Sequence, residues 1–241
     1  MTNFAKKISL IIIVVCISNF GFSQSNEIII KFIGNCGLHL TDGKSNFYID
    51  FPYKQGAYRW MNPKLLKYDK SRLFGTYNKS EVDSIKENAI FIFTHRHLDH
   101  YSKKILKKLD GKKYDPWNVA ELTELNSSIP DFNIEAFKTK HKIKGIYWKH
   151  YSYLITWHGK KIYISGDTGD FEHVSKIKDI DWAFVNYWSH EEHAKIDAKK
   201  FGIYHFDPIQ KIIGEAPANV LLLINQGEII RIPFGQLLLK N

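Results

Sequence analysis

Cysteine is scarce in this chain: two occur in 241 residues, Cys16 and Cys36. Cys16 lies in an N-terminal stretch that we expect to be removed, which would leave Cys36 as the one thiol of the mature protein. A single thiol cannot form an intramolecular disulfide, so stability must come from the hydrophobic core and from any bound metal. A zinc site built from thiolates is excluded for the same reason.

The N-terminus lacks an apolar run long enough to span a bilayer. Its run from Ile8 to Ile17 is about half of the ~20 residues that a transmembrane helix needs. Lys6 and Lys7 precede this run and small residues follow it, which is the layout of a secretory signal peptide. We therefore predict a signal peptide over residues 1–23 and one mature domain over residues 24–241, exported to the periplasm or the cell exterior. A lipoprotein signal ending at Cys16 is a weaker alternative, because large valines precede that cysteine.

Dense basic clusters are few, although the chain is basic overall. The formal net charge is +9, and removal of Lys6 and Lys7 would lower it by two, to +7. This excess favours anionic partners or substrates. Because the lysines are spread along the chain, nucleic-acid binding is not expected. The one dense run is typical of a solvated helix face and consists of Lys103, Lys104, Lys107, Lys108, Lys112 and Lys113.

Internal repeats and low-complexity linkers are absent from the sequence, which indicates one domain. Apolar runs predict strands over 28–33, 38–41, 47–50, 90–93, 134–140, 148–157, 161–165, 182–186 and 202–204, with a closing hairpin over 220–224 and 228–232. Helices are predicted over 80–87, capped by Ser80, and over 102–109, 119–125, 194–200 and 208–213. Asp42-Gly43 suits a tight hairpin turn. Strand runs, helices and strand runs again predict two sheets in one α/β domain.

Metal-binding side chains are concentrated between residues 91 and 100, in the sequence Phe-Ile-Phe-Thr-His-Arg-His-Leu-Asp-His. They follow a buried strand and precede a helix, so we expect them on a loop held by rigid elements. Alternate residues of an extended segment point the same way, which groups His95 with His97, while Asp99 and His100 can reach a second point. This loop could therefore supply ligands to two cations.

Three further polar residues follow predicted strands. His141 ends the strand at 134–140, Asp167 lies in a glycine-flanked turn after the strand at 161–165, and His205 follows the strand at 202–204. A carboxylate has two oxygens, so Asp167 could bridge two cations. His190 and His193 are alternatives to His205, although their polar loop is more typical of surface groups.

The order of these motifs resembles the metallo-β-lactamase superfamily: HxHxDH, a later histidine, a Gly-Asp-Thr-Gly turn and a final histidine, over nearly the whole mature chain. The resemblance implies a metallo-β-lactamase fold, an α/β four-layered αββα sandwich with a dinuclear site at one edge. It implies two divalent metal ions, with zinc preferred and iron or manganese also compatible with nitrogen and oxygen ligands. The implied ligands are His95, His97 and His141 for the first metal, Asp99, His100 and His205 for the second, and Asp167 as the bridge. Asp99 would also orient the attacking hydroxide and so act in catalysis.

The implied function is that of an exported metal-dependent hydrolase that cleaves an ester, lactone or phosphodiester bond. The stretches at 150–155 and 162–169 look most like the branch that contains ascorbate-phosphate lactonases and N-acyl-phosphatidylethanolamine phospholipases. We therefore expect a small-molecule or lipid-like substrate that is anionic. The alternatives are a nuclease-like phosphodiesterase, motivated by the positive charge, and a metal-holding protein without turnover.

The sequence allows two roles each for Asp50 and for the segment from Tyr53 to Asn78. Asp50 ends a buried strand, so its carboxylate either supports the metal site or caps the strand end. The segment from Tyr53 to Asn78 is rich in aromatic residues without a clear period. It either lines a substrate pocket or packs on the core.

Overall fold

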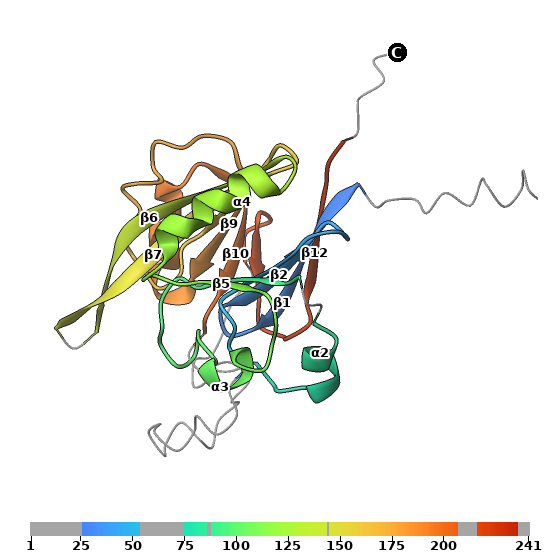
Figure 1. Cartoon of the computed structure of the whole chain (residues 1–241). Helices are drawn as coiled ribbons and strands as arrows, with labels where there is room; N and C mark the ends of the chain where they lie inside the picture. The colour runs from blue at the N-terminus through green and yellow to red at the C-terminus, as the bar shows by residue number, and fades with distance from the viewer. Residues whose placement is uncertain (1–25, 54–74, 86–87, 144, 207–215, 236–241) are drawn as a thin grey trace, which may run out of the picture.

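Two six-stranded sheets dominate the computed structural model, which describes residues 26–53, 75–85, 88–143, 145–206 and 216–235 (Figure 1). In the order of its strands, the first sheet consists of β12 (Ile229–Pro233), β1 (Glu27–Gly34), β2 (Gly37–Thr41), β3 (Asn46–Ile49), β4 (Ile90–Ile92) and β5 (Lys112–Tyr114). The second sheet consists of β11 (Val220–Leu222), β10 (Ala198–Tyr204), β9 (Ile180–Asn186), β8 (Lys160–Ile164), β7 (Ile146–Trp157) and β6 (Phe132–Ile143).

Both sheets combine antiparallel and parallel strands. Strand β3 pairs in parallel with β4, and β8, β9 and β10 pair in parallel with one another. Parallel strands end at the same edge of a sheet, and ligands of α/β proteins bind outside those carboxyl ends. A ligand site is therefore expected in the loops after β3, β4, β8 and β10.

The main core lies between the two sheets. Side chains alternate across a strand, so Ile28 and Ile30 of β1 face inward together. Phe47 of β3 stacks on Phe132 of β6 with 4.6 Å between ring centroids and meets Trp157 of β7 edge-on at 5.1 Å. These contacts join the sheets face to face and bury the inner side of each.

The outer faces have apolar layers of their own. On the first sheet, Phe91 packs with Val82 and Ile105, which come from α2 (Lys79–Asp83) and α3 (Lys103–Leu106). The second sheet is covered by the segment around residues 171–177 and by the residues that follow the 3-10 helix η4 (Tyr187–Lys195). The helices η3 (Val119–Leu122) and α4 (Thr123–Ser128) add Leu122 and Leu125 to the main core beside β6.

The predicted four-layered α/β sandwich is confirmed, with outer layers made of short helices and loops (Figure 1). Within the described ranges, no helix has the length and hydrophobicity needed to cross a membrane.

Three helix predictions were wrong in their extent. Helix α2 begins at Lys79, and the side chain of Asn78 rather than Ser80 accepts the N–H of Glu81. Helix α3 ends at Leu106, three residues earlier than predicted. The helix predicted over residues 194–200 does not form, because η4 ends at Lys195 and the chain from Ala198 onward pairs in parallel with β9.

Two strand predictions also need correction. Strand β6 continues through His141 to Ile143, so His141 projects from within a strand rather than from its end. The predicted C-terminal hairpin is wrong, since β11 pairs with β10 in the second sheet and β12 pairs with β1 in the first. The predicted signal peptide, most of the aromatic segment and the helix at 208–213 lie outside the described residues.

Candidate metal centre

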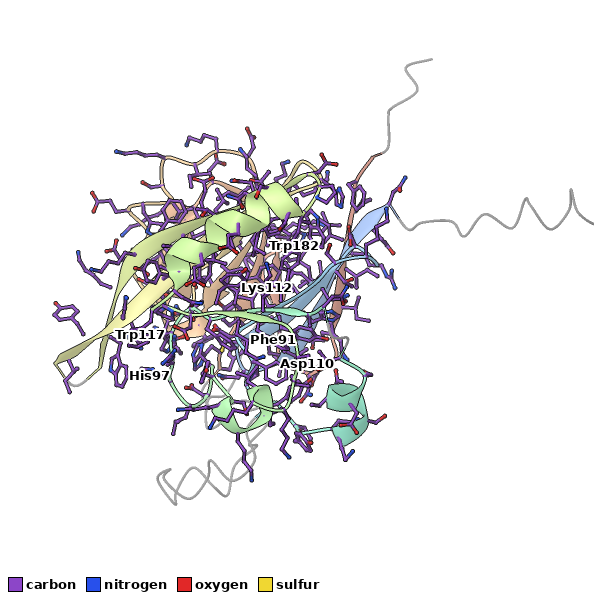
Figure 2. The ribbon with its side chains drawn as sticks, viewed as in Figure 1. Phe91, His97, Asp110, Lys112, Trp117 and Trp182 are labelled. Carbon is purple, nitrogen blue, oxygen red and sulfur yellow. The ribbon has the colours of Figure 1, made fainter. Side chains whose placement is uncertain are left out.

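The loop after β4 carries four predicted ligands and brings its three histidines close together; His97 and Trp117 are labelled on the same side of the molecule in the view of Figure 2. The N–H groups of His100 and Tyr101 both donate to the carbonyl of His97, at 3.1 and 2.9 Å, which closes the loop into a tight turn. The ring centroid of His95 consequently lies 4.4 Å from that of His97 and 3.9 Å from that of His100.

A first cluster contains His95, His97, His141 and Asp167. Nδ1 of His97 lies 2.8 Å from Nε2 of His95 and 3.3 Å from Nε2 of His141. Oδ2 of Asp167 lies 3.5 Å from Nε2 of His95 and 3.8 Å from Nε2 of His141. Tetrahedral ligands at zinc–nitrogen distances of about 2.0–2.1 Å lie about 3.3–3.4 Å apart. The four donor atoms therefore have the spacing of a tetrahedral zinc site.

A second cluster contains Asp99, His100, His205 and the other oxygen of Asp167. Nε2 of His100 lies 3.1 Å from Nε2 of His205, and Oδ1 of Asp167 lies 3.2 and 3.5 Å from these two nitrogens. Oδ2 of Asp99 lies 3.3 Å from Nε2 of His205 and 3.9 Å from Nε2 of His100. These spacings are again those of ligands around one small cation.

Asp167 joins the clusters because each of its oxygens faces a different one. Its Oδ1 is buried and receives no hydrogen bond from the described residues. A buried carboxylate oxygen without a donor requires another positive partner. Burial would raise the pKa of Asp167, but His100, His205 and His95 outweigh burial and hold that pKa well below its usual value. The carboxylate is therefore ionised and suited to a cation.

Asp50 fixes which nitrogen of two histidines faces the clusters. Its Oδ2 accepts the hydroxyl of Thr94 at 2.8 Å and Nδ1–H of His100 at 2.9 Å. The oxygen of Thr94 is then free to accept Nδ1–H of His95, at 3.0 Å. Nε2 of His95 and Nε2 of His100 are consequently left to face the clusters. Of the two roles predicted for Asp50, the structure supports the one in which its carboxylate supports the site.

Burial keeps the first cluster neutral. It lowers the pKa of His95 well below the usual value, lowers that of His97 to about 4, and lowers that of His141. Nδ1–H of His141 donates to the backbone carbonyl of Asp167 at 3.1 Å, so its Nε2 carries a lone pair. Lone pairs this close repel one another unless a cation lies between them, and neutral imidazoles are the form that binds zinc. The donor set therefore fits a divalent transition metal.

His205 is held in a strained backbone conformation. Its φ of +61° lies in the left-handed region, which non-glycine residues rarely adopt. Its N–H donates to the carbonyl of Asn35 at 2.8 Å, which holds the residue in place directly after β10. Strain of this kind persists where the surroundings over-determine a conformation, and it is concentrated at functional sites.

The alternatives to His205 differ in placement. The ring of His193 packs on Phe201, with 4.8 Å between centroids, and His193 is not among the residues of either cluster. The side chain of His190 lies outside the described part of the structure.

The sequence did not reveal a role for His150. This buried histidine accepts the backbone N–H of Asp167 at its Nε2, at 2.9 Å, and its Nδ1 lies 2.6 Å from the hydroxyl of Thr139. Thr139 and His150 are opposite each other in the β6–β7 pair. The register of β6 with β7 brings these residues together, and no local sequence signal reports it.

Cys36 also lies at the second cluster, although we had excluded thiolate sites. Its Sγ lies 3.1 Å from Nδ1 and 3.5 Å from Nε2 of His100. Nδ1–H of His100 already points at Asp50 in the plane of the ring. Because Sγ of Cys36 is nearly equidistant from Nδ1 and Nε2, it lies over the face of the ring. Burial raises the pKa of the Cys36 thiol well above its usual value. The sulfur of Cys36 therefore packs against the His100 ring and is not placed as a metal ligand beside Nε2 of that ring.

Comparisons with known proteins identify the fold. No family model matches the sequence, and no curated protein is similar to it at the sequence level. Among solved structures, the metallo hydrolase Igni18 of the archaeon Ignicoccus hospitalis has a TM-score of 0.60 at 17% identity, over 87% of this chain and 100% of that chain. A protein described as a metal-dependent hydrolase of Veillonella parvula has a TM-score of 0.58 at 14% identity, over 85% of this chain and 99% of that chain.

A third structure, an isothiocyanate hydrolase from Delia radicum gut bacteria, has a TM-score of 0.54 at 14% identity, over 84% of this chain and 98% of that chain. Together with the two facing sheets, these likenesses show that the chain shares the fold of these hydrolases, which is the two-sheet α/β sandwich that the sequence predicts.

Proposed function

We propose that this protein is a metal-dependent hydrolase of the metallo-β-lactamase superfamily with a dinuclear centre. The first metal would be held by His95, His97 and His141, the second by Asp99, His100 and His205, and both by Asp167. The observation that carries this proposal is the division of Asp167 between the clusters: Oδ2 is 3.5 Å from His95 and Oδ1 is 3.2 Å from His100. Zinc is the preferred metal, and iron or manganese would also suit these ligands.

Two cations held by these residues would supply Lewis acidity, which would lower the pKa of a water molecule toward neutrality and stabilise negative charge on oxygen. The chain's own residues then have separate tasks. His95, His100 and His205 are buried and hold position, whereas the side chain of Asp99 is 24% exposed. Asp99 is therefore the ligand best placed to accept a hydrogen bond from an attacking water and to orient it.

Burial would raise the pKa of Asp99, but His100 and His205 outweigh it and lower that pKa. Asp99 is thus a carboxylate at neutral pH and can accept a hydrogen bond from the water. His150 holds the backbone N–H of Asp167, so the two oxygens of this carboxylate stay directed at the first and the second cluster. We place no leaving-group acid among these residues.

The bond that we propose is an ester, a lactone or a phosphodiester in a small-molecule or lipid-like, anionic substrate. The three structural neighbours support hydrolysis, and their names describe different or unspecified substrates, so the fold alone does not select the bond. We also propose that residues 1–23 direct export to the periplasm or the cell exterior. The exported chain would then contain Cys36 as its one cysteine and could form no intramolecular disulfide.

The test is a hydrolase screen on metal-loaded protein with carboxylic esters, lactones, phosphodiesters and polynucleotides. We expect turnover of at least one class, and loss of that turnover in His97→Ala and Asp167→Ala. Turnover that survives both substitutions, or a protein that binds metal and turns nothing over, would contradict the proposal. Preferred cleavage of polynucleotides with a steep salt dependence would favour the nuclease-like alternative.

A further inference from the structure

Exposed apolar side chains are concentrated at the edge that carries the metal centre. Eight large apolar side chains are exposed in the described part of the chain. Six of them lie on the metal loop, against its neighbours or at the start of β7: Leu98, Trp117, Ile146, Tyr147, Trp148 and Trp188. Single exposed apolar residues are ordinary on a protein surface, but a gathering of this size marks an interaction surface.

Contacts tie these side chains to the centre. The ring of Trp148 lies 4.1 Å from that of His97, in the first cluster, and the ring of Trp188 lies 4.5 Å from that of His205, in the second. Leu98 stands between two ligands in the loop itself. The exposed rings of Trp148 and Trp188 therefore lie against the first and the second cluster, respectively.

The hairpin of β6 and β7 extends this surface outward. Its end projects beyond the body of the sandwich, on the side where His97 and Trp117 lie (Figures 1 and 2). Ile146 and Tyr147, near the turn, are 64% and 65% exposed. These exposed apolar side chains at the projecting strand end enlarge the apolar surface beside the metal centre.

Basic groups surround the same edge. An open cavity of about 740 Å³ beside the metal loop is lined by Arg96, Leu98, Tyr101, Lys103, Lys104 and Lys107. Arg96 is fixed by Asp115, with Nε at 3.0 Å from Oδ2, and its guanidinium lies 4.5 Å from the centroid of the Trp117 ring. None of the three lysines forms an ion pair with another described residue, so their charges are available to an external anion. Lys149, on the projecting hairpin, lies 5.5 Å from the same Trp117 ring.

We propose that this edge docks on an anionic lipid surface. Tryptophan and tyrosine favour the boundary between water and lipid, because their rings combine an apolar body with a polar group. Lysine and arginine are attracted by anionic headgroups, and apolar insertion combined with such charge gives reversible binding. A second protein would account for the apolar residues, but the unpaired cations around them favour a surface of dense negative charge. The docking itself does not depend on the proposed function. Only its consequence does, namely that the metal centre would act on a substrate at the lipid surface.

The test is sedimentation of the full-length, metal-loaded mature protein with two kinds of vesicle, one of phosphatidylcholine and one of equimolar phosphatidylcholine and phosphatidylglycerol. We expect binding to the anionic vesicles to be stronger on the order of tenfold or more, and to weaken with added salt. The double variant Ile146→Ser with Tyr147→Ser should bind roughly tenfold more weakly. Its matched control is Leu221→Ser with Ile229→Ser, which removes two exposed apolar side chains from the outer strands β11 and β12.

A second variant, Lys103→Glu with Lys107→Glu, keeps the proposal testable if the hairpin variant is unstable. It should abolish the preference for anionic vesicles while leaving metal content unchanged. Equal binding to both vesicles, no binding, or equal loss in the control variant would overturn the proposal. So would a concentration-dependent dimer that disappears in the hairpin variant, since the surface would then serve a second copy. Vesicle binding needs no turnover, so binding without hydrolysis would contradict the proposed function and leave the docking surface intact.

Discussion

The backbone N–H of Asp167 donates to Nε2 of His150 at 2.9 Å, so the carboxylate that joins the two clusters is held from behind by a buried histidine. His150 is positioned in turn by the hydroxyl of Thr139, 2.6 Å from its Nδ1. Burial lowers the pKa of His150 to about 3, which keeps Nε2 available as an acceptor at neutral pH. The position of Asp167 therefore depends on a residue that has no place in the ligand set.

Replacement of His150 should weaken metal binding without removing a ligand. In His150→Ala the N–H of Asp167 loses its acceptor, which should cost about 1–3 kcal/mol of unfolding free energy. Metal affinity should fall about 10- to 100-fold, as is usual when a partner of a metal ligand is lost. Competition with a chromophoric chelator and urea unfolding would measure the two effects. His150→Gln, which retains an acceptor, should fall between wild type and alanine, and the half-buried His173→Ala serves as the control. Equal metal affinity in all four proteins would contradict this role.

Gly166, in the turn before Asp167, should not tolerate a side chain. A Cβ there would lie 2.6 Å from Nε2 of His150 and 2.8 Å from Cβ of Thr94, and φ is +59°. We expect Gly166→Ala to lose about 2–3 kcal/mol or more of stability, together with metal affinity. Gly159→Ala is the matched control, because Gly159 has φ of +74° but nothing within 4 Å of a Cβ. It should lose about 1 kcal/mol, the cost of the left-handed backbone alone. Thermal unfolding of both variants would check this, and equal losses would rule out the steric explanation.

The two metal positions should respond differently to pH. Burial alone would lower the pKa of His100, but the carboxylates of Asp167, Asp50 and Asp99 outweigh burial and raise that pKa well above its usual value. In the metal-free protein His100 therefore carries a proton through the neutral range, and a cation at the second position must displace it. His95, His97 and His141 have lowered pKa values, that of His97 being about 4, so these three histidines are neutral through the neutral range and no proton competes there at the first position.

Affinity at the second position should consequently fall about tenfold for each pH unit of acidification through the neutral range, while affinity at the first stays nearly constant. Zinc titrations in metal buffers at several pH values would measure both constants. Calorimetry in buffers of different ionisation enthalpy would count the proton that is released. Equal slopes at the two positions, or no proton release, would contradict the different protonation of the clusters.

Cys36 should not be a metal ligand, although its sulfur lies 3.5 Å from Nε2 of His100. Its place over the ring face predicts that cobalt-loaded protein lacks an intense thiolate-to-metal charge-transfer band. Cys36→Ser should keep the metal content of the wild type. A near-ultraviolet band that disappears in Cys36→Ser would show instead that the thiolate binds the metal.

The order of the proposed ligands could be predicted from the sequence, because all of them except His141 lie in the loops that follow buried strands. The strand ending at Ile92 and the loop from His95 to His100 behave as their residue types predict. His205 directly follows β10, although that strand is longer than expected. Periodicity and punctuation by glycine are local signals, and they were sufficient for these elements.

Pairing between distant strands could not be read in the same way. Val220–Leu222 and Ile229–Pro233 are both strands, as expected, but each joins a different sheet, which no local signal reports. The contact of His150 with Asp167 depends on the register of β6 with β7 and on the β7–β8 pair. The segment beginning at Ala198 became a strand because parallel pairing with β9 outweighed its local preference.

Metal content of single variants tests the two-metal centre most directly. Wild-type protein, loaded with zinc and freed of excess, should contain two metal ions per chain by elemental analysis. His97→Ala and His205→Ala should each retain one, because each removes a ligand from one cluster, and Asp167→Ala should weaken both positions. A content of one ion per chain in the wild type, or the same loss from His97→Ala and His205→Ala with Asp167→Ala unaffected, would contradict a centre bridged by Asp167.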